Sequence, residues 1–188
     1  MTATTVNQVD WSIEIVEESN VTAALDAEFR RLLLQCFGAD SVVFSQTRHW
    51  HGSVPAYSVI ARQDGRLVAH TGIIVRDIRA GDHPVRIYGI QNMGVAPEAR
   101  GTGVGLRVLE EAAREADRRG IPFGVLFCVP KLERYYRRDG WETRDVAVRM
   151  DYDGQANIPI PGKNVCMIKC LTAEVFADGE MHLQGADW

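Results

Sequence analysis

The first 53 residues alternate between segments with strand-like and helix-like spacing of apolar side chains. Residues 11–17 alternate apolar with polar side chains, which predicts a first strand. The next apolar residues recur on one face at helical spacing, so we expect a helix capped by Asn20 that runs to about Phe37, with Gly38 ending it. Residues 40–53 are aromatic and polar, and we expect them to form a loop or a short helix.

Three segments rich in apolar and β-branched residues follow, separated by short turns. They cover residues 55–62, 66–79 and 85–95, with turns at 63–65 and 80–83. Because short turns join antiparallel neighbours, this part of the chain predicts an antiparallel meander of three strands.

The second half returns to helical spacing and then to an apolar run. We expect a helix over about residues 102–119, since its apolar positions share one face, with Gly120 closing it. Residues 123–129 are almost continuously apolar, which is typical of a strand covered on both faces. A strand, a helix and a strand in that order predict a parallel pair with a right-handed crossover. The remaining predictions are a short helix over 131–138, a strand over 142–151, a loop over 154–162 and a last strand over 164–171.

Three glycines at alternate positions separate the third strand of the meander from the long helix. They are Gly101, Gly103 and Gly105. Glycine lets a backbone approach a ligand closely, and unpaired N–H groups at a helix N-terminus favour an anion. We interpret the segment as a phosphate-binding loop; the alternative is a glycine-rich helix start without a ligand. Gly105 is followed by Leu106 rather than Lys, which excludes a Walker loop, and the third glycine comes one position too early for a dinucleotide fingerprint.

Composition narrows the class of protein further. The 188 residues are 46% hydrophobic and 24% charged, with a net charge of −4, which is ordinary for a globular protein and argues against nucleic-acid binding. No apolar run approaches the ~20 residues of a membrane span, and the N-terminus lacks a signal pattern, so we expect a cytoplasmic protein. The four cysteines are expected to be free thiols rather than metal ligands. We expect one domain over residues 1–188, with 1–10 as a loose tail.

Two motifs resemble those of the GCN5-related N-acetyltransferases, the GNAT family. They are Arg100-x-x-Gly103-x-Gly105 and the segment Tyr135–Trp141, which is similar to the family's Tyr-x-x-x-Gly-Phe/Trp. The resemblance implies an α/β fold, with a mixed sheet of six or seven strands, an antiparallel meander then splayed parallel strands, and flanking helices. It also implies an enzyme that uses acetyl-CoA as co-substrate and needs no metal. The coenzyme-binding residues that it implies are Met93, Gly94, Val95, Arg100, Gly101, Thr102, Gly103, Val104 and Gly105.

Acetyl transfer to an amine needs a neutral nucleophile and a proton for the departing thiolate. The resemblance places Tyr136 near the coenzyme sulfur, as general acid; the alternative is a tyrosine that only packs in the core. Gln91 and Asn92 stand where many relatives carry a glutamate base, and amides cannot act as bases. His70 is then the nearest titratable candidate, and a chain of water molecules is the alternative.

Two subfamily resemblances point to an amino-sugar amine as acceptor. Residues 65–70 and the ending Asp187-Trp188 look like the aminoglycoside 2′-N-acetyltransferases, which would make this an antibiotic-resistance enzyme for a small cationic substrate. Residues 120–124 and 85–98 are similar to the nodulation-factor N-acyltransferases, which move a fatty acyl chain onto an amino sugar. A non-catalytic acyl-CoA-binding module is the alternative from another class, and a homodimer is left open. In a transferase fold the segment 40–53 is expected to form a wall of the acceptor site, and the alternative is a satellite packing cluster. The predicted acceptor residues are Trp50, Gln91, Asn92, Asp187 and Trp188.

Overall fold

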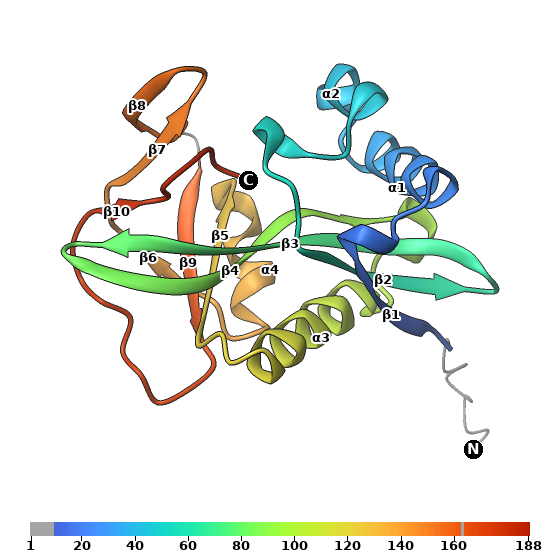
Figure 1. Ribbon diagram of the computed structural model, residues 1–188. Coiled ribbons are helices and arrows are strands. Elements are labelled where there is room, and N and C mark those ends of the chain that lie inside the picture. The colour runs from blue at the N-terminus through green and yellow to red at the C-terminus, as the bar shows by residue number, and fades with distance from the viewer. Residues whose placement is uncertain (1–9, 163) are drawn as a thin grey trace.

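The structure is a computed structural model that describes residues 10–162 and 164–188. The tail expected over residues 1–10 lies, except for Asp10, outside the described residues. The described chain forms one mixed, ten-stranded sheet with helices packed against it (Figure 1).

The meander predicted from the sequence forms the centre of this sheet. Strands β2 (Tyr57–Gln63), β3 (Arg66–Ala80) and β4 (His83–Val95) are antiparallel neighbours, and β1 (Ser12–Glu17) pairs with β2 at the edge. Strand β3 is the longest, because its far end also pairs with a short strand from the C-terminal region, β10 (Met181–His182).

Strands β4 and β5 (Phe123–Cys128) run parallel but stay paired over a short distance only. Residues Ile87–Gly89 pair with Phe123–Val125, and beyond Gly89 the two strands diverge. This divergence exposes one edge of each strand inside the molecule. The two edges form the walls of the cavity described below.

The other elements complete the sheet on the side of β5 and beyond β10. The order along the sheet is β6-β9-β5-β4-β3-β10-β7-β8. The remaining strands are β6 (Glu142–Arg144), β7 (Val148–Tyr152), β8 (Gln155–Pro159) and β9 (Val165–Cys170).

Four α-helices accompany the sheet. Helix α1 (Ala23–Cys36) and the short α2 (Ser41–Gln46) lie above the sheet in Figure 1, and α3 (Val104–Arg118) lies below it. Helix α4 (Glu133–Arg137) follows β5. Helix α1 begins later than predicted, because Thr22 rather than Asn20 is its N-cap: the Thr22 hydroxyl accepts a 3.2 Å hydrogen bond from the backbone N–H of Leu25.

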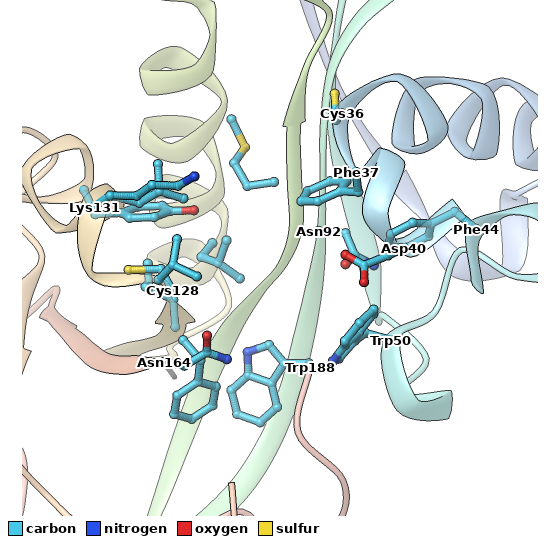
Figure 2. A pocket seen from close by; sticks show the side chains of 17 residues that line it. Cys36, Phe37, Asp40, Phe44, Trp50, Asn92, Cys128, Lys131, Asn164 and Trp188 are labelled. Atoms are coloured by element: carbon cyan, nitrogen blue, oxygen red, sulfur yellow. The ribbon is translucent and has the colours of Figure 1, made fainter. Parts of the chain in front are cut away.

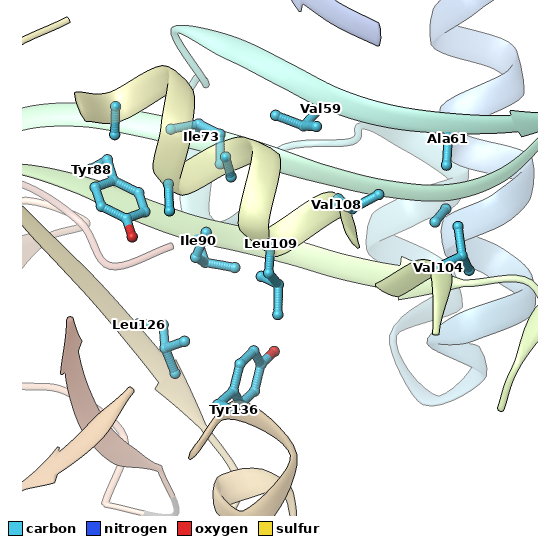
Figure 3. Packing of buried hydrophobic residues seen from close by; sticks show 14 of the residues in the cluster. Val59, Ala61, Ile73, Tyr88, Ile90, Val104, Val108, Leu109, Leu126 and Tyr136 are labelled. Carbon is cyan, nitrogen blue, oxygen red and sulfur yellow. The ribbon is translucent and has the colours of Figure 1, made fainter. Parts of the chain in front are cut away.

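The face of α3 predicted to be buried packs on the meander. Val108 and Leu109 of this helix are at most 1% exposed and lie against residues of β2, β3 and β4 (Figure 3). No helix among the described residues is long and apolar enough to cross a membrane.

Three details of the predicted sheet were wrong. The sheet has ten strands rather than six or seven. The strand predicted over 142–151 is broken into β6 and β7 because its two halves pair with different partners, β9 and the β8–β10 side. The predicted loop over 154–162 contains β8. Pairing partners far apart in the sequence decide these short strands, and no local pattern records them.

Candidate active site

Two cavities meet at the place where β4 and β5 diverge. One, of 390 Å³, opens between the two strands on the side of α2 and the C-terminus, and we call it the acceptor cavity. The other, of 560 Å³, lies over the glycine loop at the start of α3, and we call it the coenzyme cavity. Three residues line both cavities: Met93, Leu132 and Tyr136. The two cavities are therefore adjacent and share part of their lining.

The glycine loop has a backbone conformation that favours glycine at two positions. Gly101 and Gly103 have φ of 78° and 94°, in the left-handed region that favours glycine. Gly103 is the N-cap of α3 and has no side chain to occupy the first-turn N–H groups. The N–H groups of Val104 and Leu106 donate to the Thr102 hydroxyl and the Gly103 carbonyl, and the helix dipole favours an anion at this end of the helix.

Most of the residues predicted to bind the coenzyme line the coenzyme cavity. Two do not: Val104 is fully buried beneath the loop, and Gly94 packs against Cys36. Arg138 lines the cavity together with Arg100, so two guanidinium groups are available to a diphosphate. The predicted residues that line it are Met93, Val95, Arg100, Gly101, Thr102, Gly103 and Gly105.

Tyr136 occupies the junction of the two cavities. Helix α4 presents it, and its ring packs toward Leu109 and Leu126 (Figure 3), leaving only 7% of the residue exposed. Burial raises the pKa of Tyr136 above its usual range. The phenol consequently keeps its proton at neutral pH, which is the state that a proton donor needs.

Strand β4 is interrupted beside Tyr136 by a β-bulge. The pairing with β3 shifts between the pairs His70–Gly94 and Gly72–Gln91, so β4 carries one extra residue there, and Asn92 has a φ of 52°. A bulge leaves its extra residue out of the ladder hydrogen bonds. Asn92 and Met93 both line the acceptor cavity, so the unpaired stretch of backbone lies beside it.

The segment before β2 forms the wall opposite β5. Trp50 lines the acceptor cavity, as predicted, and packs 6.1 Å from Phe44 between ring centroids. Arg48 anchors this segment through ion pairs to Glu18 and Asp26, and its backbone carbonyl accepts a 3.0 Å hydrogen bond from the Asn92 side chain. The wall is therefore tied both to α1 and to the bulge.

The chain end is inserted between the diverging strands. Trp188 is 6% exposed and lines the acceptor cavity (Figure 2). Its ring packs at a tilt against Phe127, with 5.3 Å between the ring centroids. Its indole packs so closely on Gly89 that a Cβ there would come within 2.4 Å of the ring. The Arg76 guanidinium lies 5.5 Å from the ring and donates a 2.7 Å hydrogen bond to the carbonyl of Ala186. The tail is thus a packed element of the cavity wall.

Two predicted acceptor residues do not line the cavity. Asp187 is 3% exposed and its carboxylate is paired with the ring of His51, so it is not available to a ligand in the cavity. Gln91 is 1% exposed, and its amide donates a 3.0 Å hydrogen bond to the carbonyl of Ser53. Both side chains instead hold the wall in place from behind.

His70 is not placed to act as the base. Its side chain lies 3.2 Å from the hydroxyl of Ser58 and 4.5 Å from the ring of Phe29, and it lines neither cavity. Burial, reinforced by the charge of Arg48, lowers the pKa of His70 to about 3. Residues 69 and 70 pair with β2 and β4 inside the sheet. His70 is therefore close to β4, which explains why its position on the strand suggested that it would lie near the reacting groups.

Several cavity residues escaped the sequence analysis. Asp40 and Lys131 line opposite walls of the acceptor cavity, and Asn164 lines it beside Trp188 (Figure 2). Asp40 belongs to the segment 40–53 that the sequence analysis treated as a wall, so the segment was found but not the residue. Lys131 follows β5 and Asn164 precedes β9. The order of the strands in the sheet brings these two residues to the cavity, and local sequence does not show that order.

Comparison with known proteins agrees with this geometry. The sequence profile of a family described as Acetyltransferase (GNAT) domain matches residues 19–144. The chain is 28% identical over 137 residues to Nodulation protein A of Bradyrhizobium elkanii, and 27% identical over 138 residues to Nodulation protein A of Mesorhizobium plurifarium. These alignments cover 70% and 71% of this chain but 63% and 69% of the relatives.

Solved structures show the same fold. A GNAT family N-acetyltransferase (YhbS) from Escherichia coli in complex with CoA superposes with a TM-score of 0.65 at 16% identity, covering 97% of this chain and 94% of that one. An acyl-CoA N-acyltransferase from Pseudomonas aeruginosa gives a TM-score of 0.59 at 19% identity, covering 86% of this chain and all of the other.

Proposed function

Because the chain belongs to the GNAT acetyltransferase family, we propose that it transfers an acyl group from acyl-CoA to the primary amine of a small acceptor. One observation carries the proposal: Tyr136 lines both cavities, so a single phenol is available to the coenzyme on one side and the acceptor on the other. Acetyl-CoA is the proposed donor, with the two phosphates of its diphosphate over Thr102–Gly105.

The chemistry follows from the groups at this junction. The amine lone pair attacks the thioester carbonyl carbon, the C–S bond breaks, and Tyr136 donates its proton to the departing sulfur. The nitrogen loses one proton as the amide forms, and this proton returns to Tyr136 through water, so the phenol is restored. The thioester carbonyl oxygen would be stabilised by backbone N–H groups at the bulge, next to Met93. Since His70 is buried elsewhere, we assign deprotonation of the incoming ammonium to water in the acceptor cavity.

For the acceptor we propose an amino-sugar amine. The matches to Nodulation protein A agree with one of the two sequence resemblances, and a longer acyl donor is the second candidate on that account. The proposal of an aminoglycoside rests on the ending Asp187-Trp188, and of these two residues Trp188 lines the cavity. The non-catalytic module stays the alternative from another class.

A donor and acceptor screen tests the proposal. The purified protein is incubated with acetyl-CoA or a long-chain acyl-CoA and a panel of amino sugars and simple amines, while free thiol and the mass of each amine are followed. We expect thiol release that depends on an amine and a matching acyl mass shift. Coenzyme binding without transfer to any amine would instead support the non-catalytic module.

A further inference from the structure

Among the described residues, Asp40 is the one acidic side chain that lines the acceptor cavity. It is half-buried, and no hydrogen bond or ion pair of its side chain is found among residues 10–162 and 164–188. Three other buried or half-buried aspartates are engaged: Asp26 pairs with Arg48, Asp187 with His51, and Asp139 with Lys169. Asp40 differs from them because its carboxylate has no such partner among the described residues.

The Asp40 side chain points into the cavity from the N-terminal end of α2. Asp40 is the N-cap of α2, where an aspartate side chain ordinarily accepts a hydrogen bond from the first turn. Here it makes no side-chain capping hydrogen bond. Figure 2 shows its carboxylate turned into the cavity, near Asn92.

Aromatic rings surround this carboxylate. Phe37, Phe44 and Trp50 line the same wall, with centroid distances of 5.4 Å between Phe37 and Phe44 and 6.1 Å between Phe44 and Trp50. Aromatic faces attract a cation, and a carboxylate among them adds direct electrostatic attraction, which does not require an N–H donor on the cation. Lys131 reaches in from the opposite wall (Figure 2), so positive charge on a ligand is favoured on the Asp40 side only.

We infer that Asp40 and its aromatic neighbours form the ammonium-recognition site of the acceptor cavity, and that Asp40 is the specificity-determining residue for a cationic acceptor. This inference rests on the proposed function, because it takes the acceptor to be an amine. It assigns to Asp40 the electrostatic role that the sequence resemblance had given to Asp187.

Binding of a cation that cannot be acylated tests the site independently of catalysis. Benzyltrimethylammonium is titrated into the protein by calorimetry, beside its uncharged carbon isostere, neopentylbenzene, in a displacement format. We expect the cation to bind more tightly than the isostere, and Asp40→Asn to weaken the cation by about tenfold while leaving the isostere unchanged. Asp40→Glu should recover part of the affinity.

The matched control is Asp64→Asn in the β2–β3 turn, where the left-handed φ of 50° suits asparagine. This variant should bind the cation like the wild type. Equal affinity for cation and isostere, or a cation affinity that Asp40→Asn leaves intact in a folded protein, would overturn the inference. Absence of acyl transfer in the screen above would overturn the proposed function instead, and leaves this binding result standing on its own.

Discussion

Tyr136 and His70 were predicted to act as acid and base, but their surroundings in the structure differ. Burial acts on both in the direction of the uncharged form. For Tyr136 this preserves a proton at a place where two cavities meet. For His70 it prevents protonation at a place that no substrate reaches.

Replacing Tyr136 with Phe should lower kcat more than it weakens acetyl-CoA binding. The hydroxyl matters when charge develops on sulfur, so its loss should cost about 10²–10⁴-fold in turnover. Single-turnover kinetics measures the chemical step directly. Tyr135→Phe on the same helix, which lines only the coenzyme cavity, is the control. Wild-type turnover in Tyr136→Phe would reduce Tyr136 to a packing role.

Replacing His70 with Gln should leave kcat within about threefold of the wild type, since the histidine does not act in catalysis. It should also change the acid stability of the protein. The folded pKa of about 3 lies below the unfolded value of 6.5, so the unfolded chain takes up a proton first as pH falls. The wild type should lose up to about 1.4 kcal/mol of unfolding free energy per pH unit below about 6.

Denaturant titrations of both proteins between pH 7 and pH 4 measure this difference. The wild type should lose stability more steeply than His70→Gln over that range. Parallel pH dependence would mean that His70 is accessible to protons in the folded state, and a large loss of kcat would return it to the candidate bases.

At the scale of elements, the start of α3 and the bulge in β4 are two interruptions of regular structure that face the same cavities. The glycine loop brings the N-terminal end of the α3 dipole to the coenzyme cavity, and the bulge frees a stretch of β4 backbone. Backbone groups therefore supply much of the polar surface in a site whose side chains are largely apolar.

Gly103→Asn should weaken acetyl-CoA binding by about tenfold or more, because it adds a side chain where the diphosphate approaches the backbone. Asparagine tolerates a left-handed φ, and Asn92 and Asn157 of this chain adopt one, so the variant should fold. Gly65→Asn, at a φ of 76° in the β2–β3 turn, is the matched control. Calorimetry with a thermal melt measures both, and unchanged affinity in Gly103→Asn would contradict the phosphate-binding loop.

At the scale of the whole molecule, two segments that are far apart in the sequence close the acceptor cavity. The wall from α2 and Trp50 meets the C-terminal tail, and His51 joins them by pairing with Asp187 and stacking 4.5 Å from the ring of Tyr152. In Figure 1 the β7–β8 hairpin and α2 stand on either side of the C-terminus. The cavity exists only when these distant segments are assembled.

Deleting residues 187–188 should raise the acceptor KM and also lower the melting temperature. Removing a buried tryptophan costs about 3–5 kcal/mol, and it also opens the wall of the acceptor cavity. Acetyl-CoA affinity should change less than twofold, because the tail does not line the coenzyme cavity. Leu183→Ala is the control, since Leu183 is fully buried but lies outside both cavities.

Steady-state kinetics for both substrates, below the melting temperature of each variant, separates the two effects. The control should lower stability without changing the acceptor KM. An acceptor KM that rises equally in both variants would show that the tail acts through stability alone.

Local pattern was sufficient for much of this protein. The spacing of apolar residues predicted the meander, α3 and the strand β5, and the alternate glycines predicted the loop at the helix start. These elements follow from interactions within a few residues or from one continuous apolar face, which a sequence displays directly. The same local motifs indicated the family to which the chain belongs.

Tertiary structure alone decided which polar groups face the ligand. Asp40, Asp187 and His70 are all titratable residues in plausible positions along the chain, yet one lines the cavity, one is paired behind its wall and one is buried in the sheet. Their roles depend on partners that lie far away in sequence, such as His51 for Asp187. Charge compensation and burial are properties of the assembled neighbourhood, so no local spacing could reveal them.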